Sequence, residues 1–142
     1  MSSHALGRAF NVVPTADGVE VCLSDAGGVT FVCVGANAET FTVAEATDAA
    51  GTGAATLATV TTYYTNSGAA GATTWARVNQ AAGGVITTTT ALPVAVIEIE
   101  ATELSDGFSY VRCTSSSTGT VVALLRDLAV QRGPANLVAP AL

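Results

Sequence analysis

The chain has 142 residues and a formal net charge of −6, with 11 Asp and Glu against 5 basic residues, all of them Arg. Its length fits a single domain, and the acidic balance argues against a nucleic-acid-binding protein, which needs a basic patch to displace phosphate counterions. Only 11% of the residues are charged, so the surface must consist largely of Thr, Ser, Ala and Gly, which is unusual for a free monomer.

Short Val- and Thr-rich segments recur along the chain, separated by turns that carry Gly, Asp and Asn. Such segments predict β-strands, because β-branched residues fit a pleated, half-buried surface. Residues 39–50 contain good helix formers, but Thr and Val recur there at period two, which favours a strand. The predicted strands span residues 19–23, 29–34, 40–46, 56–65, 73–80, 85–90, 94–100, 108–115 and 120–126.

Turn signals predict how some of these strands pair. Residues 19–23 and 29–34 flank an Asp-Ala-Gly-Gly turn and are predicted to form a hairpin. Residues 108–115 and 120–126 flank a Ser-Ser-Thr-Gly turn and are predicted to form a closing hairpin. Residues 101–107 have room for one helical turn.

Period-two alternation assigns side chains to strand faces. In residues 94–100, Ala95, Ile97 and Ile99 are expected to face inward, with Glu98 and Glu100 outward. In residues 56–65, Leu57 and Tyr63 are expected on one face, with Val60 and Tyr64 on the other. Trp75 and Arg77 are expected on the face opposite Ala76 and Val78.

We therefore predict an all-β fold, a β-sandwich or jelly-roll-like barrel of eight or nine short strands. The domain is expected to span residues 16–126, between an N-terminal arm of residues 1–15 and a C-terminal arm of residues 127–142. The C-terminal arm is too apolar for a solvated, disordered end, so it is expected to pack on the domain or on a neighbour.

Residues of catalytic type are few. His4 is the only histidine and lies near a terminus, where a catalytic geometry is hard to hold. Glu98 and Glu100 are spaced for acid/base chemistry, but an exposed strand face explains them better. The Gly-rich segments lack the features of a phosphate-binding loop, and no metal-ligand spacing occurs. We expect no catalytic residues, no cofactor and no metal.

No apolar run is long enough to span a bilayer, and the N-terminal residues do not read as a secretory signal. Cys22, Cys33 and Cys113 fit reduced, mostly buried thiols in a protein made in a reducing cytosol. A bridge between Cys22 and Cys33 on neighbouring strands is the alternative.

The remaining candidate functional residues are those expected to contact a binding partner. Trp and Arg are enriched at interaction hot spots, so Trp75, Arg77 and the outward-facing Tyr64 are candidates, with host-glycan binding through the aromatic rings as an alternative. The apolar tail contributes Asn136, Leu137, Val138 and Leu142.

From about residue 29 onward the chain resembles small structural proteins of tailed bacteriophages. The resemblance is carried by EATDAAGTGA at residues 45–54, the acidic EIEATEL and GFSYVR segments within residues 98–112, and the apolar end, residues 133–142. It implies a non-enzymatic decoration or minor capsid protein on the virion head surface, made in the bacterial cytoplasm. Its partners would be the major capsid protein and further copies of itself, without nucleic acid or membrane. A tail-tube or head-tail joining protein is the alternative within the virion.

Overall fold

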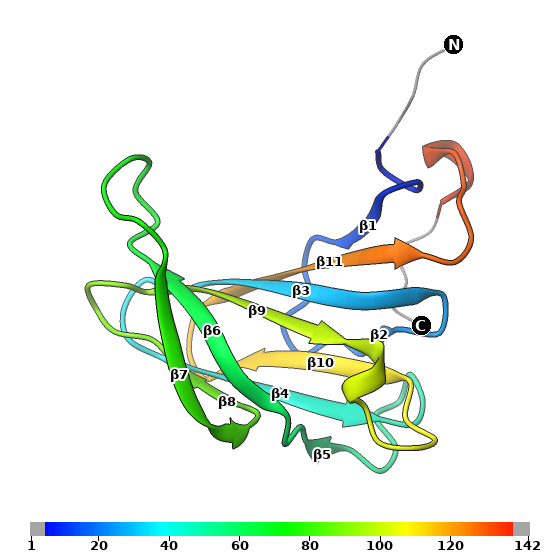
Figure 1. Ribbon diagram of the computed structural model, residues 1–142, viewed down its shortest axis with the longest axis horizontal. Coiled ribbons are helices and arrows are strands. Elements are labelled where there is room, and N and C mark those ends of the chain that lie inside the picture. The colour runs from blue at the N-terminus through cyan, green and yellow to red at the C-terminus, as the bar shows by residue number, and fades with distance from the viewer. Residues whose placement is uncertain (1–4, 138–142) are drawn as a thin grey trace.

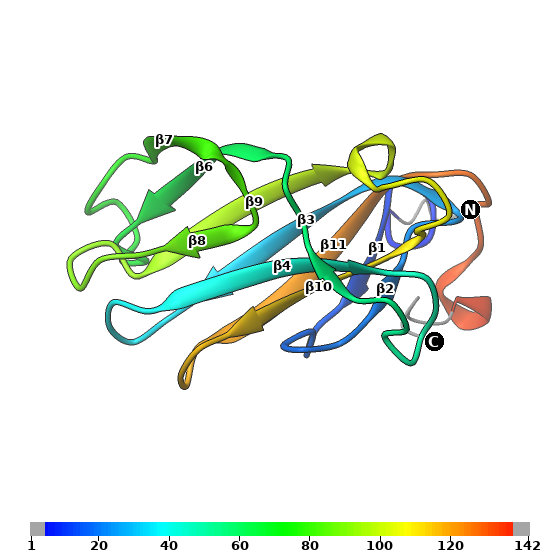
Figure 2. The ribbon, with the colours of Figure 1, turned by 90° about the horizontal axis from the view of Figure 1, so that it is seen from below.

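The computed structural model describes residues 5–137, which form two antiparallel β-sheets packed face to face (Figures 1 and 2). The six-stranded sheet has the order β1-β11-β3-β9-β6-β7, with bounds Phe10–Val13, Thr120–Leu128, Ala26–Val34, Val94–Glu100, Val60–Asn66 and Ala76–Gly83. The second sheet has the order β2-β10-β4-β5, with β8 also paired to β4 and bounds Val21–Cys22, Tyr110–Ser115, Thr40–Ala46, Ala55–Thr56 and Val85–Thr87. The predicted all-β, sandwich-like fold is confirmed.

The core lies between the sheets and follows the predicted alternation. In β9, Ala95, Ile97 and Ile99 are fully buried, while Glu98 and Glu100 are exposed. The largest fully buried side chains come from both sheets: Phe31, Ile97, Ile99 and Leu125 from the six-stranded sheet, and Phe41 and Ile86 from the other. Residues 39–50 contain β4 rather than a helix, as predicted, and the single turn after β9 is the 3-10 helix η1, Ala101–Glu103.

Both predicted hairpins are wrong, because the strands concerned belong to different sheets. β2 pairs with β10, whereas β3 pairs with β9 and β11. Likewise β10 pairs with β4 and β2, whereas β11 pairs with β3 and β1. A short turn is compatible with a hairpin but does not require one, and β3 gains far longer partners in β9 and β11 than the two-residue β2 offers.

The predicted strand over residues 56–65 is two strands in two sheets. β5 pairs with β4, and the chain then crosses to β6, which pairs with β7 and β9. The pairing of β6 with β7 is irregular between Val60 and Thr62, where two steps along β6 face four steps along β7. The predicted alternation is wrong here, because Val60 and Tyr63 are both buried although they were predicted to face opposite sides.

The chain returns between the sheets at Gly84, which joins β7 to β8. A Cβ atom at Gly84 would clash with the carbonyl oxygen of Leu57 and would lie 2.6 Å from that of Val43. The Gly84 carbonyl accepts a hydrogen bond from the Val43 amide at 2.7 Å. Only glycine lets the two backbones approach this closely.

The terminal segments lie against the domain and against each other. Within the predicted N-terminal arm, β1 pairs with β11 at the edge of the six-stranded sheet. The Arg132 amide donates to the Gly7 carbonyl at 2.9 Å, and the Ala129 amide donates to the Asp25 carbonyl at 2.8 Å. The segment after β11 ends in the 3-10 helix η2, Pro134–Asn136.

Candidate interaction surface

The outer faces of the two sheets differ in their β-branched side chains, which are mostly polar threonine on one sheet and mostly apolar valine on the other. The outer face of the five-stranded sheet is rich in threonine, namely Thr40, Thr42, Thr56, Thr87 and Thr114. At outward positions the six-stranded sheet carries Val12, Val32, Val34, Val94, Val96, Val122 and Leu124, which we name the valine face. Thr30 and Glu98 lie on the same side of the sheet, in register with Leu124. Threonine and valine have the same shape, so the two faces differ in polarity rather than in fit to a strand.

Strand register makes the valine face continuous across the sheet. Val122 on β11 lies opposite Val32 on β3, and Val32 lies opposite Val96 on β9. Val96 lies opposite Tyr64 on β6, and Tyr64 lies opposite Arg77 on β7. Directly opposed side chains in an antiparallel sheet share a face, so this row crosses five strands without a break.

Neighbouring rows widen the surface. On one side of the central row, Val12 lies opposite Leu124, and the row then continues through Thr30 to Glu98. On the other side, Val34 lies opposite Val94. With strands about 4.8 Å apart and outward residues about 7 Å apart along a strand, its seven residues cover about 240 Å². The largest apolar patch of a monomer is often functional.

The three interface candidates from the strands lie together at the β6–β7 end of the valine face. Trp75 is 52% exposed and Tyr64 is 41% exposed. Arg77 is exposed and donates from Nε to Asn79 Oδ1 at 3.2 Å. Tyr63 is buried and donates from its hydroxyl to the Thr87 carbonyl at 3.0 Å. The predicted split between an inward and an outward tyrosine is therefore confirmed.

The loop between β6 and β7 forms a groove over this end of the valine face. The groove has a volume of about 490 Å³ and is lined by Val32, Val34, Asn66, Gly68, Ala69, Ala70, Gly71, Thr73, Trp75 and Val94. Asn66 holds the loop in shape, donating from Nδ2 to the Thr73 carbonyl at 3.1 Å and accepting the Gly68 amide at 2.9 Å. The groove thus has an apolar floor and an exposed indole beside it.

An ionic strip bounds the valine face toward the other end of β3. Arg126 on β11 and Glu100 on β9 both lie opposite Gly28, so the guanidinium crosses the glycine to reach the carboxylate at 2.7 Å. The hydrogen bond from Arg126 holds the pKa of the Glu100 carboxyl below its ordinary value. Arg126 also contacts Asp127 at 3.3 Å, and Glu98 is exposed nearby on β9.

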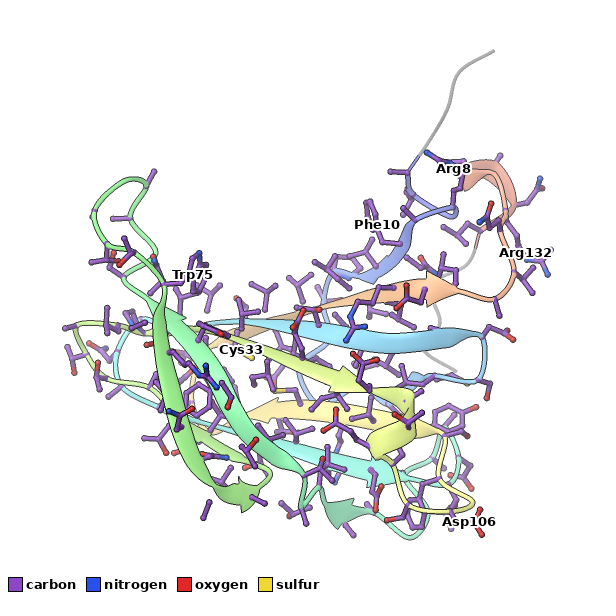
Figure 3. The ribbon with its side chains drawn as sticks, in the orientation of Figure 1. Arg8, Phe10, Cys33, Trp75, Asp106 and Arg132 are labelled. Atoms are coloured by element: carbon purple, nitrogen blue, oxygen red, sulfur yellow. The ribbon has the colours of Figure 1, made fainter. Side chains whose placement is uncertain are left out.

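Projections stand at both ends of the surface. The β6–β7 loop and the terminal segments rise on the same side of the molecule (Figure 1), with Trp75 beside one and Phe10 beside the other (Figure 3). Among the tail candidates, Asn136 is exposed, while Leu137 is half-buried and its Cδ2 lies 3.3 Å from a Cβ built on Gly7. Val138 and Leu142 lie outside the described residues.

The buried carboxylates are engaged in contacts within the chain. Glu45 accepts the Ser105 hydroxyl at 2.6 Å and the Ser105 amide at 2.8 Å. Glu20 pairs with Arg112 at 2.7 Å. Within residues 5–137, no group of three or more His, Cys, Asp or Glu side chains is placed to hold a metal ion. His4 lies outside the described part of the chain.

Comparison with known proteins adds no identification. No protein family, curated protein or solved structure matches the chain. In the part of the chain that the structure describes, no helix has the length and apolar character to cross a membrane.

The valine face is the feature that the sequence interpretation missed. Its signal is present in the sequence: residues 29–34, 94–97 and 121–125 are apolar at almost every position instead of alternating with polar residues. In an antiparallel strand with one solvated face, alternation is expected. Apolar residues on both faces therefore indicate a second covered surface, and these three segments are the neighbouring strands β11, β3 and β9.

Proposed function

We propose that the protein is a non-enzymatic structural subunit of a virus particle, and that it binds a neighbouring shell protein through the valine face. The observation that carries the proposal is the contrast between the valine face and the threonine-rich outer face of the other sheet. The resemblance to small tailed-phage proteins supports the virion context, and decoration of the outer head shell is the position that we favour.

The surface has the composition of a binding site rather than of a solvated sheet. An apolar centre is bordered by Trp75, Tyr64 and Arg77, residue types that dominate binding energy at protein interfaces. The flat face of about 240 Å² is smaller than the roughly 800 Å² that each partner contributes to a standard interface. The β6–β7 loop and the terminal segments, which project at its two ends, supply further contact area.

The charge of the chain favours a different protein over a second copy as the occupant of this surface. Each copy carries a formal charge of −6, and Glu98 and Glu100 lie beside the face. Two such faces placed together would bring like charges into contact, which opposes association. A shell protein with an apolar patch bordered by basic residues fits both features. A lattice of shell subunits would also raise the effective concentration of binding sites for each copy.

Host-glycan binding is the second candidate, and the exposed Trp75 ring beside the groove favours it. An indole beside a groove with polar groups such as those of Asn66 and Thr73 offers a platform on which a sugar ring can stack. A glycan array probed with the wild-type protein and with Trp75→Ala separates the candidates. Binding by the wild type that is lost in the variant would favour glycan recognition.

Cryo-electron microscopy of particles of the virus that encodes the chain tests the proposed function. The expected result is density for the β-sandwich on the outer head shell, with the valine face against the shell protein and the threonine-rich face toward solvent. Density in the tail or connector would favour the alternative virion position. Absence of the chain from purified particles, checked by mass spectrometry, would overturn the virion assignment.

A further inference from the structure

Two cysteines meet in the centre of the sandwich. Cys33 on β3 and Cys113 on β10 belong to different sheets, and both side chains are fully buried. Their Sγ atoms are 3.6 Å apart, although the residues are 80 positions apart in the sequence. Both thiols are free, as is Cys22. The structure thus places two thiols in contact across the interface between the sheets (Figure 3 labels Cys33).

We propose that Cys33 and Cys113 are the site of a disulfide bond that joins the two sheets when the protein meets a disulfide oxidant. The reaction is thiol-disulfide exchange with a small disulfide such as oxidised glutathione. One cysteine thiolate attacks the oxidant and releases one glutathione thiolate, and the second cysteine then displaces the other. The two cysteines lose two protons and two electrons, and the oxidant is reduced to two glutathione molecules.

The distance to be closed is small. A disulfide has an S–S length of about 2.05 Å, so the sulfurs must approach by about 1.5 Å, a shift within reach of side-chain rotation and slight strand adjustment. The two sulfurs already touch, so no side chain has to be displaced from between them. Cys33 lies opposite Ala95 and Val121, and Cys113 lies opposite Val43, so the surroundings are small or β-branched apolar side chains.

Cys22 is not part of this site. It lies on the outer face of β2, half-buried, and its sulfur is 3.3 Å from the Ser24 hydroxyl. The alternative of a Cys22–Cys33 bridge is contradicted, because both thiols are free and Cys33 faces the core whereas Cys22 faces away from it. Cys22 can therefore be removed in a test without changing the buried pair.

Burial makes the folded, reduced protein slow to react. The hydrogen bond with Cys113 and burial in the core raise the pKa of the Cys33 thiol, so the reactive thiolate is scarce. Oxidation must therefore pass through a transient opening that admits the oxidant. Cys33 and Cys113 are expected to stay reduced in a reducing compartment and to form the disulfide bond in an oxidising one.

The test uses Cys22→Ser, which keeps both buried thiols and removes the third. The protein is purified with reductant and then incubated with oxidised glutathione in urea below the unfolding midpoint, where opening is frequent. We expect intact mass to fall by two hydrogen atoms and both thiols to resist alkylation after denaturation. Closing an 80-residue loop is expected to lower the unfolding equilibrium constant by about a thousandfold and to raise the urea midpoint by about 2 M.

The matched control is Cys22→Ser/Cys113→Ala, in which only Cys33 remains. It can form a glutathione adduct but no internal bond, so its midpoint should not rise after the same treatment. If this variant does not fold, the oxidised and reduced forms of Cys22→Ser still decide the question. Glutathione adducts on both thiols, disulfide-linked dimers, or an internal bond that lowers the urea midpoint would each overturn the proposal.

Discussion

Substitution of Gly28 by alanine tests how the ionic strip beside the valine face is built. Gly28 lies on β3 between Arg126 and Glu100 in register. A Cβ atom there would lie 2.7 Å from the Ile99 carbonyl oxygen and 2.9 Å from Nη2 of Arg126. The first neighbour is backbone in a paired strand and has little freedom to move, so Gly28→Ala should strain the β3–β9 pairing and displace the guanidinium.

The expected cost follows from three effects. Overpacking in a well-packed site costs about 1–3 kcal/mol, and loss of a partly exposed ion pair adds less than about 1 kcal/mol. The lower conformational freedom of alanine in the unfolded chain offsets about 0.5–1 kcal/mol. We therefore expect Gly28→Ala to lower the free energy of unfolding by about 1–3 kcal/mol, or the urea midpoint by about 1 M, with an unchanged m-value.

Urea unfolding followed by far-UV circular dichroism measures this effect, with Gly83→Ala as the matched control. Gly83 also lies on a strand, but the nearest atom to a Cβ there is 3.7 Å away, so its substitution should leave the midpoint unchanged or slightly raised. Arg126→Met, which removes only the ion pair, should cost less than about 1 kcal/mol. A Gly28→Ala protein as stable as the wild type would refute the packing explanation.

Three further predictions concern other parts of the molecule. Gly84→Ala should destabilise by more than about 3 kcal/mol or prevent folding, because two backbone carbonyl oxygens lie within 2.6 Å of the added Cβ; soluble yield and the urea midpoint report this. The hydrogen bond from Arg126 lowers the pKa of Glu100 below its ordinary 4.5, so the stability that the ion pair contributes is present above about pH 4.5 and is lost as the pH falls through the lowered pKa. The ion pair should contribute less than about 1 kcal/mol to the free energy of unfolding. Urea midpoints measured through this pH change should therefore depend less on pH in Glu100→Gln than in the wild type. Trp75→Ala should change the urea midpoint by less than about 0.5 M, because the side chain is 52% exposed.

The sequence predicted individual strands well and their partners poorly. Period-two alternation is a local property, so the inward residues of β9 and the strand at residues 40–46 were identified correctly. Pairing depends on contacts far apart in the chain, and the turn after β2 and the turn after β10 both lead to the opposite sheet. The contact between Cys33 and Cys113 could not be predicted for the same reason, because it joins residues far apart in the chain and forms only when the two sheets pack together.

The candidate surface was predicted in part. Tyr64, Trp75 and Arg77 were identified by residue type, and the register places them together at one end of the valine face. The valines themselves were missed, because apolar residues in strands were all assigned to one core. The irregular pairing near Val60 shows a related limit, since the alternation of buried and exposed residues breaks there without a mark in the local composition.

The most direct test of the valine face compares Val34→Thr with Val85→Thr in co-sedimentation with shells of the virus particle to which we propose that the protein belongs, prepared without the protein. The two valines are 44% and 48% exposed and lie on the outer faces of opposite sheets. Burying an unpaired hydroxyl costs about 1–3 kcal/mol, so Val34→Thr should weaken binding by about five- to a hundredfold while Val85→Thr binds like the wild type. Equal binding by both variants, or a loss only in Val85→Thr, would contradict docking through the valine face.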